Sequence, residues 1–457
     1  MNCNQWIDSH KDALVRDLQG CIRIPSVYAD DGSGMPYGAE TARCLEYMLS
    51  LAKGFGFPTV NMDNQLGWCE WGEGDEMAAV LCHLDVVAEG EGWTVPPYEG
   101  VVKDGRVYGR GTMDDKGPSV AALYALASLK ESGLGLNRRI RLIFGLNEET
   151  GSADVLYYKN HGGELPVLGF TPDGEYPVIN GEKGLITEFY SRKLNQSGPI
   201  RLMDLQGGSG HNIVPSHAKA RLACPPELVK ELTTLTAEKV KCVPTEGGVL
   251  VEAEGVNAHG GTPWEGENAI GRLMLFLDRL PLEGDLKEVV HLIASRFAME
   301  WDGKSLGIAM ADQVSGDLTM NLGVAQADEK EISLKVNYRY PVTRTFEECG
   351  PQVQAIFEAA GFERTYQQHK ARIYMAPDSP LVTKLLKVYR EYTGDSSAAP
   401  KAIGGGTYAK LMPNILAFGP IFPGDEVREH KPDEFIEIDR LVDNAKILAA
   451  AMYELAN

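Results

Sequence analysis

The stretch from residue 140 to residue 151, IRLIFGLNEETG, constrains the fold more than any other part of the sequence. Its first half is a short apolar run bounded by turn-forming residues, a pattern that predicts a buried strand. The run ends at two adjacent carboxylates, Glu148 and Glu149. In α/β proteins, ligands bind beyond the carboxyl ends of parallel strands. Because neighbouring carboxylates repel each other, these two are either solvated and apart or held by a cation.

Composition limits the number of domains and the kinds of partner. A chain of 457 residues exceeds the size of one hydrophobic core, so we expect two domains. The formal net charge of -20 argues against nucleic acid and anionic membranes as partners, because both require basic surface. We also expect no membrane-spanning segment, since no apolar stretch approaches the roughly 20 residues that a bilayer requires.

The cysteines and the first residues of the sequence indicate a compartment. The eight cysteines are scattered and contain no CxxC pair, which is typical of reduced thiols in a cytosolic protein. The first residues, MNCNQWIDSHKD, lack the pattern of a secretory signal peptide. We therefore expect a cytoplasmic protein.

The order of the predicted elements indicates an α/β domain interrupted by an insertion. Before about residue 181, apolar strands such as residues 77–82 alternate with helices such as residues 118–129, which is typical of a largely parallel sheet flanked by helices. The next segment alternates strands and helices in the manner of an α+β domain, with helix candidates at residues 226–235, 269–279 and 346–359. We predict a catalytic domain formed by residues 1–181 and 379–457, and an inserted domain formed by residues 182–378.

Five short stretches place an imidazole or a carboxylate after an apolar strand or in a glycine-rich turn. They contain His83 with Asp85, Asp114 with Asp115, Glu148 with Glu149, Asp173, and His430. A mixed set of histidine and carboxylate ligands suits Zn, Mn or Co rather than Ca or Mg. Each stretch alone has an ordinary structural explanation, such as a turn, a helix cap or a buried histidine. Their joint occurrence favours a metal site.

These stretches resemble the M20 metallopeptidases in order and spacing over nearly the whole chain. The matching segments are HLDVV (83–87), GRGTMDDKG (109–117), NEETGS (147–152), TPDGEYP (171–177), VNAHGGTP (256–263) and EHKPDEFI (429–436). Within the family the sequence is most similar to the bacterial PepV-type dipeptidases, because the inserted domain is long and GGGTYA precedes the last histidine. The resemblance implies a zinc-peptidase-like catalytic domain, with a mostly parallel mixed sheet flanked by helices, and an inserted α+β lid domain.

Carried over position by position, the resemblance implies two divalent metal ions, Zn in the first place and Mn or Co as alternatives. Asp114 would bridge the two ions. His83 and Asp173 would complete one site, and Glu149 and His430 would complete the other. This arrangement agrees with physical expectation, because two neighbouring cations need a shared anion and together activate a bridging water and a carbonyl.

The resemblance also implies roles for the residues around the ions. Glu148 would be the general base that takes the proton of the water and passes it to the leaving amine. Asp85 would orient His83 through its second ring nitrogen. In the family the first Asp of the DDK stretch is the ligand and the following peptide bond is often cis, which assigns Asp114 rather than Asp115.

Further residues of the lid and of the glycine loop are implied to contact the substrate. His259 matches the histidine that stabilises the oxyanion. Asn212 and Arg339 resemble the residues that hold the terminal carboxylate, and arginine suits this role because its planar fork pairs with a carboxylate in two bonds. Gly405 and Gly406 can bring backbone N–H groups close to substrate. Structural interpretations stay open, namely an ion pair for Arg339, a turn for Asn212 and a tight turn for the glycines.

Three functional hypotheses follow. The first is a dipeptidase acting on small unblocked dipeptides, favoured because Asp at the position of Asp173 accompanies aminopeptidase and dipeptidase activity in the family. The second is an N-acyl-amino-acid amidohydrolase of the same family. The third is a metal-stabilised binding protein without turnover, in which Glu148 would be dispensable. In simpler members of the family a short lid domain dimerises. The long inserted domain of this sequence resembles the lid of a monomeric member.

Asp433 stands where many relatives have Asn. Because Asp433 is not an implied ligand, this difference bears on the assignment to a subfamily more than on the chemistry.

Overall fold

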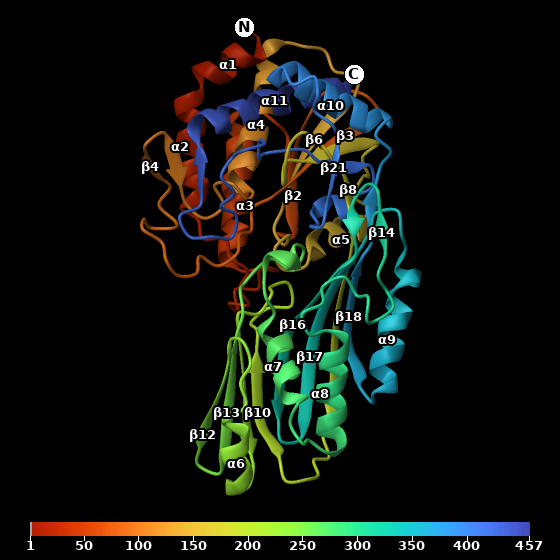
Figure 1. Ribbon diagram of the computed structural model, residues 1–457. Helices are drawn as coiled ribbons and strands as arrows, with labels where there is room; N and C mark the ends of the chain where they lie inside the picture. The colour runs from red at the N-terminus through yellow and green to blue at the C-terminus, as the bar shows by residue number, and fades with distance from the viewer. Residues whose placement is uncertain (1) are drawn as a thin grey trace. The chain divides into compact units, whose positions relative to one another are not determined.

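The chain divides into two units in the computed structural model, which describes residues 2–457 (Figure 1). The first unit comprises Met1–Asn180, Met375–Lys401 and Gly406–Asn457. The inserted unit comprises Gly181–Tyr374 and Ala402–Gly405. The chain therefore passes into the inserted unit twice, and the second, four-residue visit was not predicted from the sequence.

A mixed sheet forms the centre of the first unit. Its strands follow the order β1 (Thr59–Met62), β2 (Leu66–Trp71), β6 (Arg139–Gly145), β3 (Met77–His83), β7 (Leu168–Thr171), β21 (Ile415–Ala417) and β8 (Ile179–Glu182), with β19 (Ile373–Tyr374) and β20 (Lys401–Ile403) both pairing with β8. The four neighbours β6, β3, β7 and β21 are parallel. The pairs β1–β2, β2–β6, β21–β8 and β8–β19 are antiparallel. The predicted mixed sheet is confirmed, and its central strands pair in parallel.

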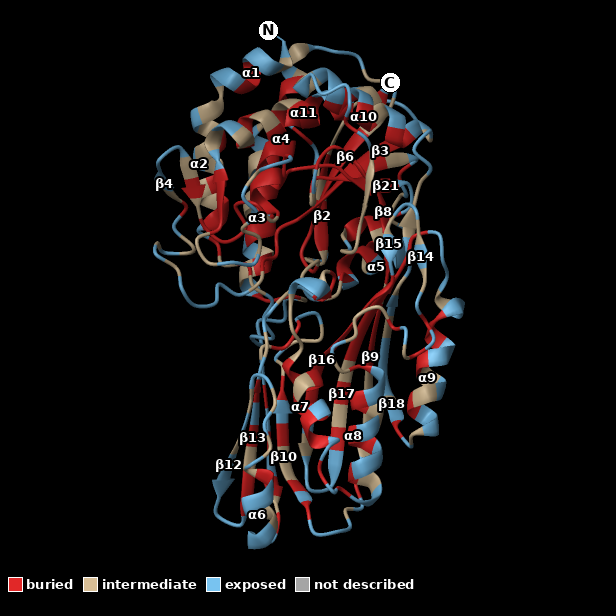
Figure 2. Cartoon of the chain, viewed as in Figure 1, coloured by how far each residue is buried: buried red, intermediate tan, exposed pale blue. Residues whose placement is uncertain are grey.

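Burial explains why these sequences form the centre of the sheet. Every residue of β3 is buried, as is nearly all of β6, which suits parallel strands covered on both faces. Figure 2 shows the same buried character along α4, whose alanine- and leucine-rich sequence is apolar on nearly every side. The helices of this unit are α1 (Cys3–Ser9), α2 (Lys11–Ile22), α3 (Ala39–Gly54), α4 (Lys116–Ser132), α5 (Ala153–Asn160), α10 (Pro380–Thr393) and α11 (Ile438–Ala456), with a short 3-10 turn η3 (Tyr408–Lys410).

A small three-stranded sheet joins two distant parts of the first unit. Strands β4 (Val101–Lys103) and β5 (Arg106–Tyr108) form a hairpin, and β22 (Phe435–Glu437) pairs with β5 antiparallel. This pairing holds the segment GRGTMDD beside the segment EHKPDEF.

The inserted unit contains an antiparallel sheet of eight strands. Their order is β12 (Val240–Thr245), β13 (Gly248–Glu254), β11 (His217–Ala223), β10 (Arg201–Gly207), β16 (Thr319–Asp328), β17 (Glu331–Tyr340), β9 (Gly184–Lys193) and β18 (Glu363–Lys370). The helices are α6 (Pro226–Leu232), α7 (Ala269–Leu277), α8 (Gly284–Arg296) and α9 (Gly350–Ala359), with 3-10 turns η1 (Pro263–Glu265) and η2 (Phe346–Glu348) and a small pair β14 (Ala311–Asp312) and β15 (Gly316–Asp317). The predicted inserted α+β domain is confirmed.

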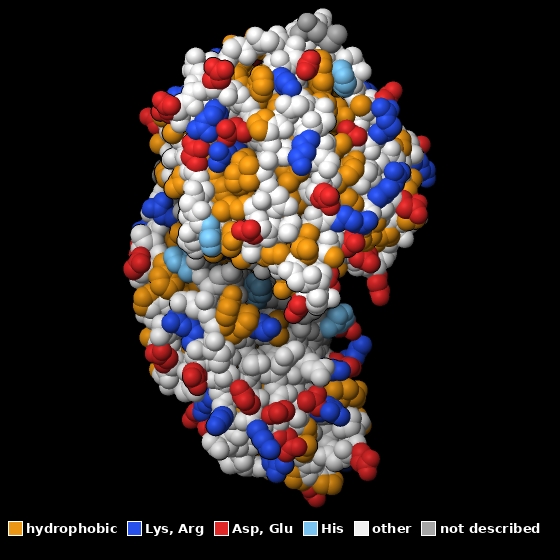
Figure 3. Space-filling model, turned by 180° about the vertical axis from the view of Figure 1, so that it is seen from behind, with side chains coloured by type: hydrophobic (Ala, Val, Ile, Leu, Met, Phe, Trp, Pro, Cys, Tyr) orange, Lys and Arg blue, Asp and Glu red, His pale blue; other side chains and the backbone are white. Residues whose placement is uncertain are grey.

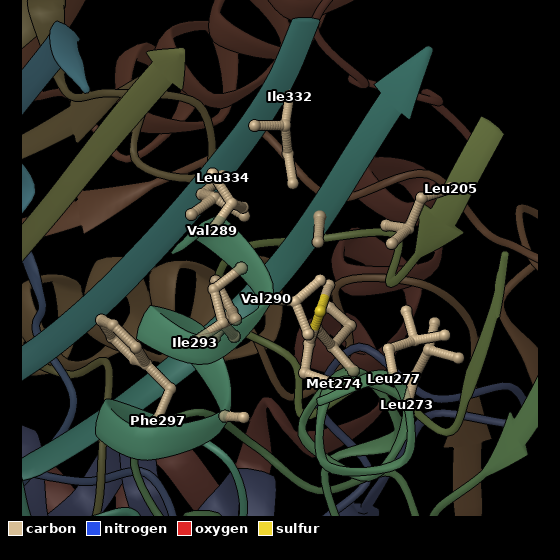
Figure 4. Packing of buried hydrophobic residues seen from close by; sticks show 14 of the residues in the cluster. Leu205, Leu273, Met274, Leu277, Val289, Val290, Ile293, Phe297, Ile332 and Leu334 are labelled. Atoms are coloured by element: carbon tan, nitrogen blue, oxygen red, sulfur yellow. The ribbon is translucent and has the colours of Figure 1, made fainter. Parts of the chain in front are cut away.

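The helices α7 and α8 cover one face of this sheet. Figure 4 shows side chains of both helices directed at side chains from the strands, among them Leu273 and Ile293 from the helices and Leu334 from β17. The strand residues alternate between this core and the opposite face, as in β11. Among residues 2–457, no helix is both long enough and apolar enough to cross a bilayer.

Candidate metal centre

The carboxyl ends of three central parallel strands supply ligand-type side chains. His83 is the last residue of β3, Glu148 and Glu149 follow β6, and Asp173 follows β7. Because parallel strands end at the same edge of a sheet, their following residues converge there. The hydrophobic runs of the sequence thus determine where these polar groups meet.

The ligand atoms form two groups that share one residue. His83, Asp114 and Asp173 form the first group, and Asp114, Glu149 and His430 form the second. In each group the ligand atoms lie within 4.8 Å of one another. The structure therefore brings together all five residues that the resemblance implied as ligands.

Asp114 presents one carboxylate oxygen to each group. Its Oδ1 lies 2.9 Å from His83 Nε2, and its Oδ2 lies 3.0 Å from His430 Nε2. His83 Nε2 is also 3.9 Å from Asp173 Oδ2, and His430 Nε2 is 3.2 Å from Glu149 Oε1. A carboxylate whose two oxygens serve two ligand groups has the arrangement of a bridging ligand.

The donor set and one buried nitrogen test whether divalent cations fit. His83 Nε2 is buried and has no partner in hydrogen-bonding geometry among residues 2–457, although Asp114 Oδ1 is near. His83 Nε2 and Asp114 Oδ1 thus lie side by side and face a shared space, without forming a hydrogen bond with each other. Imidazole nitrogen together with carboxylate oxygen is the ligand chemistry of Zn, Mn and Co. The residues fit two such ions.

Burial and the neighbouring charges shift the pKa values of these carboxyl groups. Burial, followed by the negative charge of Asp114, raises the pKa of Asp173 well above its usual range and also raises that of Glu149. Burial acts in the same direction on Asp114, but the contacts with His430 and His83 outweigh it, so the pKa of Asp114 lies below its usual range. Positive charge placed among these groups would favour their ionised forms.

The second ring nitrogen of His83 is held by the backbone more closely than by a carboxylate. His83 Nδ1 lies 3.0 Å from the carbonyl oxygen of Asp85 and 3.4 Å from its Oδ1. The Asp85 carboxylate accepts hydrogen bonds from the backbone N–H groups of Glu148 (3.1 Å) and Glu149 (3.0 Å). Asp85 thus contacts His83, as the sequence implied, and also anchors the turn that carries both glutamates.

Asp114 and its neighbour Asp115 have separate environments. The peptide bond between them is cis, as the resemblance implied. Asp115 is fully buried, and its Oδ2 accepts hydrogen bonds from the His83 N–H (3.1 Å) and from Ser119 Oγ (3.3 Å). Asp114, rather than Asp115, lies with the other ligand atoms.

Glu434 is a buried carboxylate beside the centre that the sequence analysis did not single out. It accepts hydrogen bonds from the N–H groups of Gly111, Met113 and Asp114 and forms an ion pair with Arg110 at 2.7 Å. Both side chains of the pair are almost inaccessible to solvent. The pair therefore ties the segment of Asp114 to the segment of His430. A charged residue directly before the apolar Phe435 and Ile436 was the available signal in the sequence.

Asp154 and Tyr408 form a second support that the sequence analysis missed. Asp154 Oδ2 accepts hydrogen bonds from the N–H groups of Leu146 (2.7 Å) and Asn147 (3.1 Å) and from the Tyr408 hydroxyl. Both Asp154 and Tyr408 are fully buried. The GGGTYA segment thus contributes a tyrosine that braces the turn preceding Glu148.

The residues predicted to contact substrate from the inserted unit lie together within that unit. Arg339 Nη1 donates a hydrogen bond to the Gly404 carbonyl at 2.8 Å, and its Nη2 lies 3.3 Å from His259 Nε2. The carbonyl of Asn212 accepts a hydrogen bond from the Gly260 N–H at 2.7 Å, which joins the loops of Asn212 and His259. The side chain of Asn212 is exposed.

The two glycines predicted to approach the substrate fall in different units. Gly405 ends the short second segment of the inserted unit, and Gly406 begins the next segment of the first unit. Gly405 is half-buried and Gly406 is exposed. Their contact with substrate stays a prediction.

Arg339 is buried without an acidic partner. Its side chain is 3% exposed, and its Nε donates to Asn337 Oδ1 at 3.4 Å. Burial lowers the pKa of this guanidinium to about 10, and no carboxylate of residues 2–457 counteracts that shift. A buried arginine without an acidic partner is suited to bind an anion. The structure thus offers no carboxylate for the structural ion pair that the sequence left open.

Comparison with known proteins agrees with this arrangement. The chain is 37% identical to "Putative dipeptidase YtjP" of Bacillus subtilis (strain 168) over 468 residues, covering 100% of both sequences. It is 34% identical to "Putative dipeptidase SAR1836" of Staphylococcus aureus (strain MRSA252), covering 98% of both.

Solved structures share the fold. The di-peptidase Dug1p from Saccharomyces cerevisiae aligns with a TM-score of 0.59 at 16% identity, covering 99% of this chain and 98% of that one. Residues 79–454 match the sequence family described as Peptidase family M20/M25/M40. The match spans most of the chain and includes all five residues of the two ligand groups, so the chain belongs to peptidase family M20/M25/M40.

Proposed function

We propose that this protein is a dipeptidase that uses two divalent metal ions to hydrolyse unblocked dipeptides. The observation that carries the proposal is the position of Asp114, whose two oxygens lie 2.9 and 3.0 Å from the imidazole nitrogens of two separate ligand groups. A single-metal site or a structural metal site has no use for a carboxylate shared in this way. The names of the similar sequences support a dipeptidase within the family.

The proposal assigns the ions to the residues that the two groups contain. His83, Asp114 and Asp173 would hold one ion, and Asp114, Glu149 and His430 would hold the other. Zn is the first choice, with Mn or Co as alternatives, because all three accept mixed imidazole and carboxylate ligands. When bound, such ions lower the pKa of water and polarise the carbonyl of the scissile bond.

Glu148 is proposed as the general base. It belongs to neither ligand group, and its backbone N–H is anchored by Asp85 in the same turn as the ligand Glu149. A carboxylate in this position accepts the proton of the attacking water and delivers it to the nitrogen of the leaving amine. Cleavage of one peptide bond then yields two amino acids.

Arg339 and His259 are proposed to act on the substrate itself. Arg339 supplies a buried positive charge that no acidic residue neutralises, and it binds the terminal carboxylate of the dipeptide. His259 lies 3.3 Å from that guanidinium, and we propose that it stabilises the oxygen that becomes negative during attack. Asn212 and the glycine loop complete the proposed substrate contacts.

The compartment and the assembly state belong to the proposal as well. All eight cysteines are free thiols, which supports a reducing compartment such as the cytoplasm. A monomer is proposed because the inserted unit is long, which resembles the lid of monomeric members of the family.

The test is a substrate panel with metal-loaded protein. We expect unblocked dipeptides to be hydrolysed with Zn, Mn or Co, and N-acyl amino acids and longer peptides to be poor substrates. Glu148→Gln should lower kcat by at least about a hundredfold while both ions remain bound. Glu426→Gln, which changes an exposed glutamate paired with Arg428, is the matched control. Turnover of N-acyl amino acids alone would instead establish an amidohydrolase. A metal-loaded protein that hydrolyses no compound of the panel would contradict the proposal that it is a peptidase.

A further inference from the structure

The sheet of the inserted unit has one face that α7 and α8 do not cover, here called the open face. Along β17, Leu334, Val336 and Tyr338 belong to the core against the helices. Since successive strand residues alternate between faces, Lys335 and Arg339 lie on the open face.

Three cations gather on the open face around β17 and β9. Arg339 and Lys370 both lie in register with Leu185, from the two strands that flank β9, so they project on the same side. Lys335 lies in register with Phe189, and its Nζ is 4.8 Å from the centre of that ring. We call these three residues the cationic cluster.

A histidine lies beside the cluster. His211 is half-buried, with its ring centre 6.4 Å from that of Phe189. Burial lowers the pKa of His211, and the positive charges of Lys335, Arg339 and Lys370 lower it further. The loop of His211 is anchored by a hydrogen bond from Asn321 Nδ2 to the His211 carbonyl.

No acidic side chain compensates the cluster. Within residues 2–457, Lys335, Arg339 and Lys370 form no ion pair with Asp or Glu. The residues between them in the register are neutral, since Asn337 lies opposite Thr187 and Thr187 lies opposite Gln368. The chain has a formal net charge of -20 and 64 acidic residues, so an uncompensated positive cluster is unusual for this composition.

Aromatic rings provide an apolar surface beside the cluster. Phe189 and Tyr366 are stacked with ring centres 4.6 Å apart, and Lys335 lies over the same Phe189 ring. Such a surface packs against the methylene groups of a ligand while the cations bind its charged end.

We propose that the cationic cluster is a specificity site for a second negative charge on the substrate, so that the preferred dipeptides carry Asp or Glu as their C-terminal residue. This inference rests on the proposed function, in which Arg339 binds the terminal carboxylate. One carboxylate neutralises Arg339 and leaves Lys335 and Lys370 without a counter-charge. The side-chain carboxylate of the same C-terminal residue supplies one negative charge to these two lysines, with its methylene groups against Phe189.

The test compares pairs of dipeptides that differ in charge and hardly in shape. We expect kcat/KM for Ala-Glu to exceed that for Ala-Gln by about tenfold, mainly through KM, because a charge-assisted contact is replaced by a neutral one. Ala-Asp and Ala-Asn form the second pair. The preference should shrink when salt is raised from 50 to 500 mM, as expected for partly exposed charges.

Variants locate the effect. Lys335→Met combined with Lys370→Met should bring the Ala-Glu to Ala-Gln ratio close to one, and the Lys→Gln versions serve if the Met versions fold poorly. Lys219→Met is the matched control, because Lys219 lies on the same face of the same sheet but opposite Glu252. It should keep the wild-type ratio. Calorimetry of both dipeptides with the metal-loaded Glu148→Gln protein measures binding without turnover.

The outcomes separate this inference from the proposed function. If Ala-Gln and Ala-Glu are hydrolysed and bound equally well, or if the lysine variants leave the ratio unchanged, the cluster is not a specificity site and the dipeptidase proposal stands. If no dipeptide is hydrolysed, the dipeptidase proposal fails and this inference fails with it.

Discussion

At the scale of single residues, the centre depends on a carboxylate that two ligand groups share. Replacing Asp114 by Asn keeps the shape and removes the charge, so Asp114→Asn should lose both ions. Asp173→Asn and Glu149→Gln should each lose one, because each residue belongs to one group only. Metal content after gel filtration, measured by mass spectrometry, checks this order.

The control for this series is Asp433→Asn. Asp433 lies three residues from His430, but its carboxylate accepts hydrogen bonds from the backbone and hydroxyl of Thr94 (2.8 and 3.0 Å). The variant should retain both ions. Equal metal loss in Asp433→Asn and Asp114→Asn would contradict the prediction that Asp114 holds both ions.

A second prediction concerns the buried carboxyl of Asp154. Burial raises its pKa from 3.8 to about 6, although the Tyr408 hydroxyl opposes the shift. Between these values the folded protein holds a proton that the unfolded chain has released, so this group makes stability fall as pH rises through the window. The stability of wild type minus that of Asp154→Asn should therefore fall by about 1 kcal/mol from pH 5 to pH 7.

Urea unfolding of metal-free protein at several pH values measures this difference. Asp63→Asn is the matched control, because exposed Asp63 also accepts a hydrogen bond from a tyrosine hydroxyl, that of Tyr157. A difference for Asp154→Asn that stays constant with pH would contradict the assignment.

At the scale of elements, the pairing of β5 with β22 brings two ligand-bearing segments together, and the Arg110–Glu434 pair locks them. Glu434→Gln keeps one acceptor but leaves a buried arginine without its charge partner, which costs about 3–5 kcal/mol when the pair is fully buried. If the fold survives, metal affinity should fall about 10- to 100-fold, as for other residues that orient ligands.

Competition with a chelator measures that affinity, and circular dichroism of the metal-free protein checks the fold. Glu437→Gln removes the partner of Arg106, a pair at 3.0 Å that is one-third to one-half exposed. Affinity in this control should stay within about twofold, because exposed pairs contribute little. The same loss in both variants would mean that the buried pair does not act through the ligands.

The helix α7 gives a prediction for the inserted unit. Leu273 is fully buried in the core shown in Figure 4, and Leu273→Ala should destabilise this unit by about 2–5 kcal/mol. Leu275 on the same helix is 42% exposed, and Leu275→Ala should change stability by less than about 0.5 kcal/mol. Hydrogen exchange of β11 and β13 reports the loss. Reduced metal content in Leu273→Ala would contradict the assignment of all ligands to the first unit.

The sequence predicts elements that depend on local apolar periodicity better than it predicts the pairing of distant strands. The strand before His83 and the helix after Asp115 were predicted because apolar periodicity is local. The helix α8 carries the same kind of signal in Leu286, Val289, Val290 and Ile293, yet the sequence analysis did not assign it. The antiparallel flanks of the central sheet depend on pairing between distant strands, which periodicity does not encode.

At the scale of the whole molecule, metal ions should stabilise one unit selectively. All five residues of the ligand groups belong to the first unit. Ions at a free concentration of about a hundred times their dissociation constant stabilise the folded unit that binds them by about 2.7 kcal/mol per site. Hydrogen exchange should therefore slow in β3, β6 and α4 on adding Zn or Mn, and the core of α7 and α8 should be unaffected. Equal protection of both cores would contradict this separation.

Charge is distributed over the whole molecule in a way that net charge alone conceals. On the face shown in Figure 3, acidic and basic side chains are interspersed. The formal charge of -20 correctly describes an acidic protein, but it does not show that Lys335, Arg339 and Lys370 stand together without acidic partners. Strand register, not composition, groups them.

The sequence by itself determined the family, the α/β plan with its insertion, and the identity of the five residues that meet in two ligand groups. It could do so because apolar runs end in polar groups at defined points, and because short motifs keep their residue types and spacing. Only the tertiary structure decided that Asp114 divides its oxygens between the groups, and that Glu434, Asp154 and Tyr408 hold the ligand turns. These contacts join residues hundreds of positions apart or hide a carboxylate in an apolar setting, and their geometry exists only once the strands are paired and packed.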